Sequence, residues 1–145
     1  VVDKPGVAAD IFEPIGKNNI NIDMVIQNTS LDGKTANITF TIKQEDLKNT
    51  LDIIEKNKNK IDYKKITHEE KLAKVSIVGA GMIASPGVTY KMFRSLAKEK
   101  INILAISTSE IKISVLVHQD LTQAAVKTLH EAFELNWWLD EHKTI

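Results

Sequence analysis

The chain has 145 residues, of which 43% are hydrophobic and 26% are charged, a composition typical of a soluble globular protein with one ordinary domain or two small ones. Lysine plus arginine and aspartate plus glutamate both number 19, so the balanced charge excludes an electrostatic basis for binding nucleic acid or an acidic membrane surface. The absence of cysteine excludes disulfides and thiolate metal sites, and because no long apolar run or signal-peptide pattern is present either, we expect a cytoplasmic protein without membrane contact.

The chain opens with an apolar pair followed by a turn. Val1 and Val2 are typical of the end of a strand, because the turn at residues 3–6 follows them directly. Apolar residues then recur at helical spacing from Val7, which predicts an amphipathic helix that ends near Asn18. The first turn of such a helix has unpaired N–H groups, so a carboxylate is favoured beside Asp3 or Lys4.

Alternating apolar and polar residues predict two strands, at residues 20–27 and 37–42, paired as an antiparallel hairpin. A second amphipathic helix is expected from Glu45 to about Lys58, and residues 61–66 are expected to form a short closing strand. The predicted order of the first unit is therefore (β)αββαβ.

A second unit repeats the first. Pro5-Gly6-Val7 returns 81 positions later as Pro86-Gly87-Val88, and the same offset pairs Phe12 with Phe93. The repeat predicts a strand at 75–78, a turn at 79–81, a helix from Pro86, a hairpin of 103–108 with 111–117, and a last helix from Asp120 or Thr122 to about Phe133. Residues 136–145 do not resemble a final strand and are interpreted as a C-terminal extension or as residues foreign to the natural protein.

These patterns predict an α+β fold made of two tandem ferredoxin-like βαββαβ units. Each unit is expected to hold a four-stranded antiparallel sheet with two helices on one face. The predicted units span residues 1–67 and 68–135, followed by the extension at 136–145.

No motif in the chain predicts catalysis. The run from Val78 to Met82 is similar to a dinucleotide loop, but Ala84 stands where the third glycine is needed. The four histidines are scattered without metal-ligand spacing, and no nucleophile elbow or phosphate loop is present. We therefore expect no catalytic residue, no metal site and no cofactor in this chain.

None of these motifs accounts for the two Pro-Gly helix starts and the two Ile-Asn-Ile segments. In the simplest interpretation Gly6 and Gly87 only permit tight turns, while Asn21 and Asn102 only lead into strands. Gln27 favours a binding role instead, because its amide offers a donor and an acceptor on an otherwise apolar strand.

Several motifs closely resemble the regulatory region of aspartate kinase, a tandem of ACT domains. They are Asp3-Lys4-Pro5-Gly6-Val7-Ala8-Ala9, Asn21-Ile22-Asp23-Met24, Gln27-Asn28, the runs 75–82, 86–88 and 106–116, and Leu129-His130-Glu131-Ala132-Phe133. The resemblance implies the regulatory part, or a separately translated small subunit, of an enzyme that phosphorylates aspartate with ATP. ATP and Mg²⁺ would then belong to a kinase domain or subunit that is absent from this chain.

The resemblance also implies a homodimer in which the first unit of one chain lies beside the second unit of the other, with threonine and/or lysine bound between them. The implied effector site consists of Asp3, Gly6, Ala8, Gln27, Asn102 and Ile103. A possible second site consists of Asn21, Ile22, Asp23, Ser85 and Gly87. The alternative hypothesis is an ACT-type assembly module without a ligand of its own.

Overall fold

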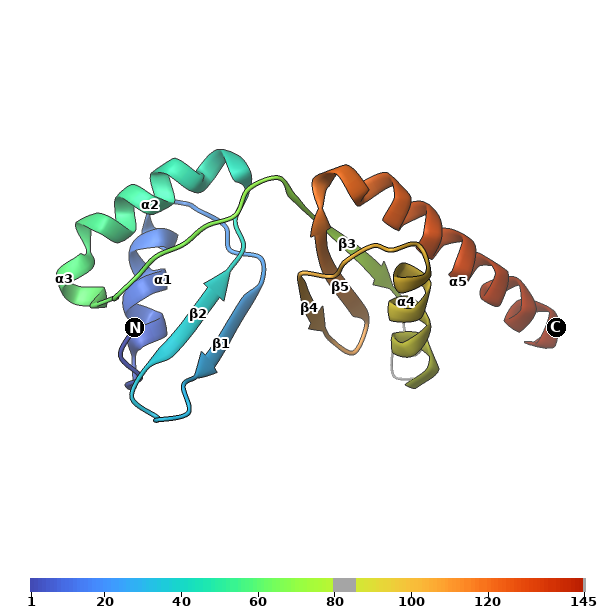
Figure 1. Cartoon of the computed structure of the whole chain (residues 1–145), viewed down its shortest axis with the longest axis horizontal. Coiled ribbons are helices and arrows are strands. Elements are labelled where there is room, and N and C mark those ends of the chain that lie inside the picture. Colours follow the sequence, from blue (N-terminus) through green and yellow to red (C-terminus); the bar gives the residue numbers. More distant parts are fainter. Residues whose placement is uncertain (80–85, 145) are drawn as a thin grey trace. The chain divides into compact units, whose positions relative to one another are not determined.

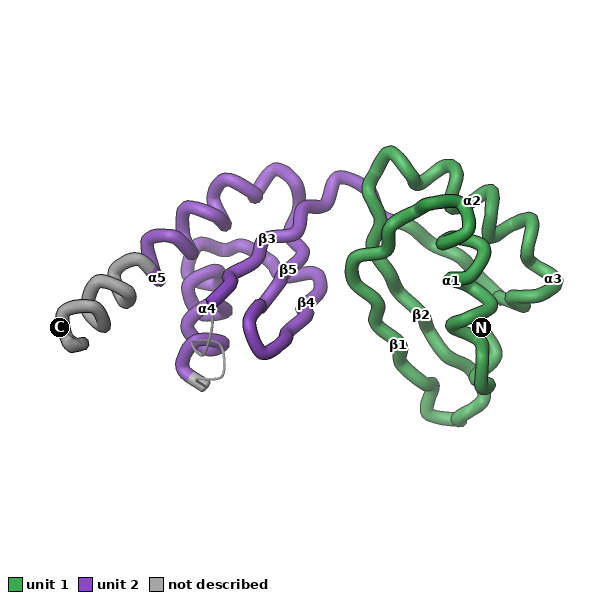
Figure 2. The backbone as a smooth tube through the Cα atoms, turned by 180° about the vertical axis from the view of Figure 1, so that it is seen from behind, with its two compact units in different colours: residues 1–68 green, residues 69–145 purple. Residues whose placement is uncertain are grey.

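The computed structural model describes the backbone of residues 1–79 and 86–144 and the side chains of those residues except Pro86 and 134–144. The chain divides into two compact units, Val1–His68 (unit 1) and Glu69–Ile145 (unit 2), shown in Figure 2. Each unit has an antiparallel sheet with helices, as the predicted α+β, ferredoxin-like class requires. The predicted Gly79–Gly81 turn falls largely on residues 80–85, which lie outside the described part of the chain.

Unit 1 packs its helices against a two-stranded ribbon (Figure 1). Its elements are α1 (Val7–Lys17), β1 (Val25–Thr29), β2 (Ala36–Phe40), the 3₁₀ turn η1 (Gln44–Asp46), α2 (Leu47–Lys56) and α3 (Lys58–Ile61). The apolar stripe of α1 forms the core with residues from α2 and α3, because positions 7, 11 and 15 fall on one side of a helix. Val2 forms an isolated antiparallel bridge with Thr35, just before β2, so the N-terminal residues pair beside β2 where a strand end was expected, although they form no strand.

Unit 2 contains a three-stranded sheet in the order β3–β5–β4. Its elements are β3 (Leu72–Val78), α4 (Pro86–Lys98), β4 (Ala105–Thr108), β5 (Lys112–His118), the 3₁₀ turn η2 (Gln119–Leu121) and α5 (Thr122–Thr144). Ile113, Val115 and Val117 of the central strand are fully buried and pack in one cluster with residues of α4 and α5. On the opposite face the hydroxyls of Ser76 and Ser114 hydrogen-bond at 2.7 Å.

The helix ends show the sequence repeat in three dimensions. Asn19 and Lys100, 81 positions apart, both adopt left-handed backbone conformations, with φ of 58° and 57°. In each unit the N–H of the next isoleucine returns to the helix, from Ile20 to the Ile15 carbonyl and from Ile101 to the Leu96 carbonyl. This is the hydrogen bond that closes a helix through a left-handed residue.

We expect Lys100→Gly to stabilise the chain by about 0.5–1 kcal/mol. Lys100 has a left-handed backbone conformation, which strains a residue with a side chain, and the relief of this strain should exceed the entropic cost of glycine. Chemical denaturation measures the change. Asn19→Gly is the matched control, and it should give a smaller gain because asparagine tolerates this conformation. A loss of stability in Lys100→Gly would contradict the argument.

The structure corrects three predicted elements of unit 1, one of unit 2 and the strand count of both units. No strand forms at 61–66. Ile61 is the buried last residue of α3, and Asp62 follows it in a left-handed backbone conformation (φ 52°) at the end of the helix. The predicted helix 45–58 starts as η1 and divides at Asn57, whose side-chain amide donates to the carbonyl of Ile53 at 2.8 Å. Among the described residues the sheets hold two and three strands, so the predicted four-stranded sheets are wrong for this chain.

The first predicted hairpin strand also starts later than expected, at Val25 rather than Ile20. Met24 donates its N–H to the Thr41 hydroxyl at 2.9 Å, so a side chain takes the place of a backbone partner just before β1. In unit 2 the last helix does not end near Phe133, because the backbone of α5 continues as helix to Thr144.

Candidate functional site

The start of α1 is an open helix N-terminus. Gly6 is the N-cap residue with φ 89°, and no side chain caps the helix. Val7 donates its N–H to the Lys4 carbonyl and Asp10 to the Gly6 carbonyl, whereas the N–H groups of Ala8 and Ala9 find no acceptor within residues 1–79 and 86–144. Unpaired N–H groups at the positive end of a helix dipole suit a carboxylate.

Asp3 lies directly beside this helix start. Its N–H donates to the Lys34 carbonyl at 3.0 Å, and the adjoining Val1 exchanges hydrogen bonds with Ala36. The half-buried Asp3 is thereby fixed along β2, only three residues before Gly6. The predicted site residues Asp3, Gly6 and Ala8 are therefore brought together by one short segment.

Gln27 lies on the face of the sheet that carries the core of unit 1. Its register partner is Ile38, a residue packed against the buried cluster, and directly opposed residues of an antiparallel pair share a face. Gln27 is nevertheless exposed, because among the described residues β1 has one neighbouring strand, β2. Its amide is available on the side of the sheet that α1 covers, whereas Asn28 faces the opposite side.

The remaining predicted residues divide between the two units. Asn102 is exposed and Ile103 packs partly against the core of unit 2. Asn21 and Ile22 repeat this pattern in unit 1, and the N–H of Asp23 donates to Thr41. Gly87 is exposed in the first turn of α4, and Ser85 lies outside the described residues.

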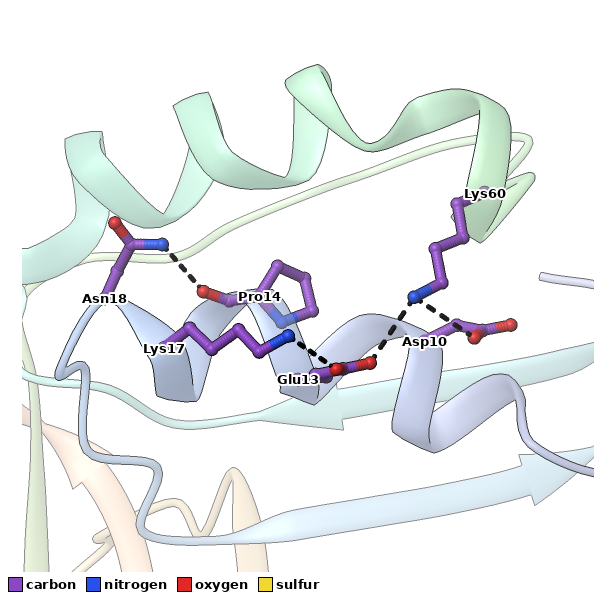
Figure 3. Close-up of polar contacts among 6 residues, drawn as sticks. All are labelled: Asp10, Glu13, Pro14, Lys17, Asn18 and Lys60. Atoms are coloured by element: carbon purple, nitrogen blue, oxygen red, sulfur yellow. Dashed lines mark hydrogen bonds and ion pairs between the residues drawn. The ribbon is translucent and has the colours of Figure 1, made fainter.

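Sequence reasoning missed the lysine that links α3 to α1 (Figure 3). The Lys60 ammonium lies 3.7 Å from Asp10 and 3.4 Å from Glu13. A hydrogen bond from Lys17, and then Lys60, lower the pKa of Glu13 below its ordinary value of 4.5. Lys60 thus offsets the Asp10 carboxylate, which stands in the first turn of α1 where it repels an incoming anion.

The corresponding face of α4 has the opposite charge. Lys91 and Arg94 stand 81 positions after Asp10 and Glu13, and no acidic partner for either is found in the described part of the chain. The helix surface there has a shallow hollow of about 440 Å³, lined by Gly87, Tyr90, Lys91, Arg94, Ser95 and Lys98. The two helices therefore differ electrostatically on this face, and their starts differ as well, because α4 begins at Pro86 whereas α1 begins only at Val7, after the left-handed Gly6.

Within the described residues, no group of three or more histidine, aspartate or glutamate side chains is placed to hold a metal ion. Nor does any described helix combine the length and apolar character needed to cross a membrane.

The open conformation of the α1 start depends on glycine. Gly6→Ala is expected to cost about 1–2 kcal/mol of folding free energy through backbone strain alone, since apart from the two adjoining residues no described atom lies within 4 Å of the added Cβ. Denaturant unfolding measures this loss. Gly16→Ala inside α1, with equally open surroundings, should instead stabilise by about 0.5–1 kcal/mol. Equal effects at both positions would contradict the assignment of strain to Gly6.

Comparison with known proteins agrees with this architecture. The ACT domain family matches residues 1–59, and a second ACT domain family matches residues 75–133. An aspartokinase of Bacillus sp. (strain MGA3) is 48% identical over 126 residues, which cover 87% of this chain but 30% of the relative. The chain thus spans about a third of the length of the curated relatives it matches.

Two solved structures match this chain over most of the length of their own chains. A chain in the crystal structure of aspartokinase alpha and beta subunits is 44% identical, with a TM-score of 0.82 and coverage of 92% of this chain and 87% of that one. The ligand-free regulatory subunit of aspartate kinase from Thermus thermophilus is 34% identical, with a TM-score of 0.79 and coverage of 91% and 87%. The chain therefore belongs to the tandem ACT-domain regulatory region of the aspartate kinases.

Proposed function

We propose that this chain senses a free amino acid, threonine and/or lysine, and transmits feedback inhibition to an aspartate kinase. The observation that carries the proposal is the uncapped α1 start at Gly6, with Asp3 beside it and Gln27 on the face of the sheet that α1 covers. The family membership supports the regulatory role, and the chemistry of these residues supports an amino acid as the ligand, while threonine and lysine are the effectors that the resemblance implies.

Each polar group of an amino acid has a suitable partner among the predicted residues. The N–H groups of Ala8 and Ala9 suit the effector carboxylate, and Asp3 or backbone carbonyls near Asn102 suit its ammonium. The Gln27 amide can bond either the carboxylate or the effector side chain. The second site, with Asn21, Ile22, Asp23, Ser85 and Gly87, stays a prediction, and the basic face of α4 gives it different electrostatics.

A homodimer completes the proposed site, with unit 1 of one chain beside unit 2 of its partner. The edge strands β1 and β4 support this pairing, because each has one side without a strand partner in the part of the chain that the structure describes, and each carries an exposed apolar residue, Val25 or Ile106. A ligand that binds one arrangement of the paired units more tightly shifts the attached kinase towards an inactive state.

The kinase domain or subunit is the proposed catalytic partner, and ATP and Mg²⁺ belong to it. The matched structure of aspartokinase alpha and beta subunits supports this partnership, as does the limited coverage of the relatives. We place the protein in the cytoplasm, consistent with its lack of cysteine.

Isothermal titration calorimetry of the purified chain with threonine and with lysine tests the effector role. We expect saturable heat with at least one of them and a melting temperature that rises with ligand concentration. Glycine, which has the same charged groups without a side chain, is the control ligand. If neither threonine nor lysine binds while the chain still associates with the kinase, the module serves assembly alone, a role that the two free strand edges also favour.

A further inference from the structure

The first turn of α1 carries a negative charge that opposes the proposed ligand. Asp10 is an acidic residue in that turn, where a negative side chain stabilises the helix dipole. Its N–H closes the turn by donating to the Gly6 carbonyl at 3.0 Å, and the two residues before it, Ala8 and Ala9, supply the N–H groups proposed to bind the effector carboxylate. Asp10 therefore stands within about one helical turn, roughly 5 Å along the axis, of a bound anion, and its carboxylate repels that anion.

Lys60 compensates the charge of Asp10 from another element, α3 (Figure 3). Its ammonium lies 3.7 Å from a carboxylate oxygen of Asp10 and 3.4 Å from one of Glu13. Glu13 has a closer partner of its own, because Lys17 donates to it at 2.7 Å. The charge of Lys60 is therefore left mainly to balance Asp10. The Asp10 side chain is also the less exposed of the two carboxylates, 29% against 48%, so solvent and salt screen its charge less.

The fold fixes the backbone of Lys60 beside α1. The next residue, Ile61, is 2% exposed and packs in the same core cluster as Ile11 of α1. The N–H groups of Lys60 and Ile61 both donate to the Asn57 carbonyl, at 3.0 and 2.9 Å. The approach of the Lys60 ammonium to α1 therefore follows from core packing and from the turn of α3.

In unit 2 the position that corresponds to Asp10 carries no negative charge. Lys91 stands there, 81 positions later, so α4 has a cation where α1 has an anion. The Lys91 ammonium lies 5.8 Å from the centre of the Phe133 ring on α5. Compensation by Lys60 is therefore particular to α1, the helix at whose start we place the effector carboxylate.

We propose that Lys60 sets the affinity of the α1 start for the effector carboxylate by balancing the charge of Asp10. This inference rests on the proposed function, because it concerns the ligand proposed there. Lys60 acts without touching the ligand. Its removal leaves an uncompensated carboxylate beside the site, whereas removal of the Asp10 charge takes a repulsive group away. The two substitutions therefore change the affinity in opposite directions.

Calorimetric titration of the full chain with threonine and with lysine tests the proposal. In about 20 mM salt, Lys60→Gln is expected to raise the Kd about 3- to 5-fold, and Asp10→Asn to lower it about 2- to 5-fold. The double variant loses one charge of each sign and should return to within about twofold of the wild type, as should Lys60→Arg, which keeps the charge. In about 0.5 M salt the differences should shrink, because the Debye length falls below about 5 Å.

Lys58→Gln is the matched control. It removes the same charge from the same helix, but the Lys58 ammonium lies 5.4 Å from the centre of the Tyr63 ring, and among the described residues no ion pair joins it to a carboxylate. Its Kd should stay within about twofold of the wild type. Melting temperatures of the ligand-free variants show whether any substitution has altered folding.

Unchanged affinity in Lys60→Gln overturns this proposal and leaves the sensing function intact. Weaker binding by Asp10→Asn also overturns it, because that result makes Asp10 a contact of the ligand. A double variant that binds as poorly as Lys60→Gln assigns Lys60 a structural role, and so does a loss in Lys60→Gln that persists at high salt. If the wild-type chain binds neither amino acid, the proposed function and this inference are both overturned.

Discussion

Leu96→Ala is expected to destabilise unit 2 by about 2–5 kcal/mol, the largest stability effect among our predictions. Leu96 is fully buried, at 0% exposure, and contacts the cluster formed by α4, α5 and the central strand. Removing its three terminal carbons forfeits both their transfer free energy and the packing around the cavity left behind. Denaturant titration, followed by hydrogen exchange measured peptide by peptide, quantifies the loss and locates it.

The repeat supplies a matched variant for this experiment. Ile15 occupies the equivalent position of α1, 81 residues earlier, and is also fully buried, but in the cluster of unit 1. Ile15→Ala should therefore speed exchange in unit 1, and Leu96→Ala in unit 2. Exposed Lys98→Ala should change stability by less than about 0.5 kcal/mol. Equal loss of protection in both units from either core variant would show that the two cores unfold as one.

Gln27→Ala is expected to weaken effector binding by about 1–3 kcal/mol, which corresponds to roughly 5- to 150-fold in Kd. In the proposed site its amide bonds a ligand group that is buried on binding and would be left without a partner. The exposed Gln27 side chain belongs to no cluster of the core, so folding should be unaffected. Calorimetry with the amino acid that binds the wild-type chain measures the loss.

Asn28→Ala provides the control, because Asn28 is the neighbouring exposed amide on the same strand but faces the opposite side of the sheet. It should leave the affinity unchanged. If both substitutions weaken binding equally, the effect comes from strand β1 as a whole. If neither does, Gln27 has no part in ligand recognition, and a site at the α1 start would depend on Asp3 and backbone groups alone.

The spacing of apolar residues was sufficient to predict the helices and strands whose side chains face a core at regular intervals. The stripe of α1 and its repeat in α4 follow from apolar spacing, and both helices begin within a residue of the predicted positions. Closeness in the chain likewise placed Asp3, Gly6 and Ala8 together at one helix start. The motifs that resemble aspartate kinase pointed to the tandem ACT family, which the matched structures confirm.

The sequence patterns predicted the wrong structure where the same residues are compatible with two different secondary structures. Ile61 is buried at the end of α3, although an isolated apolar residue after a lysine-rich run is equally typical of a closing strand. The N–H of Met24 donates to the Thr41 hydroxyl just before β1 begins. These residues are 17 positions apart, so the alternation of apolar and polar residues within one strand cannot predict this contact. Lys60 meets Asp10 and Glu13 for the same kind of reason, since three elements must fold before these charges become neighbours.

The amino-acid order alone decided the two-unit repeat, the main helices and hairpins, and the glycine at the α1 start, because each depends on residues within a few turns or strands of one another. Tertiary structure decided that Gln27 shares a face with the core and that Asp3 bonds Lys34. These features depend on strand register and long-range backbone pairing, and a shift of one residue in register would move Gln27 to the other side of the sheet.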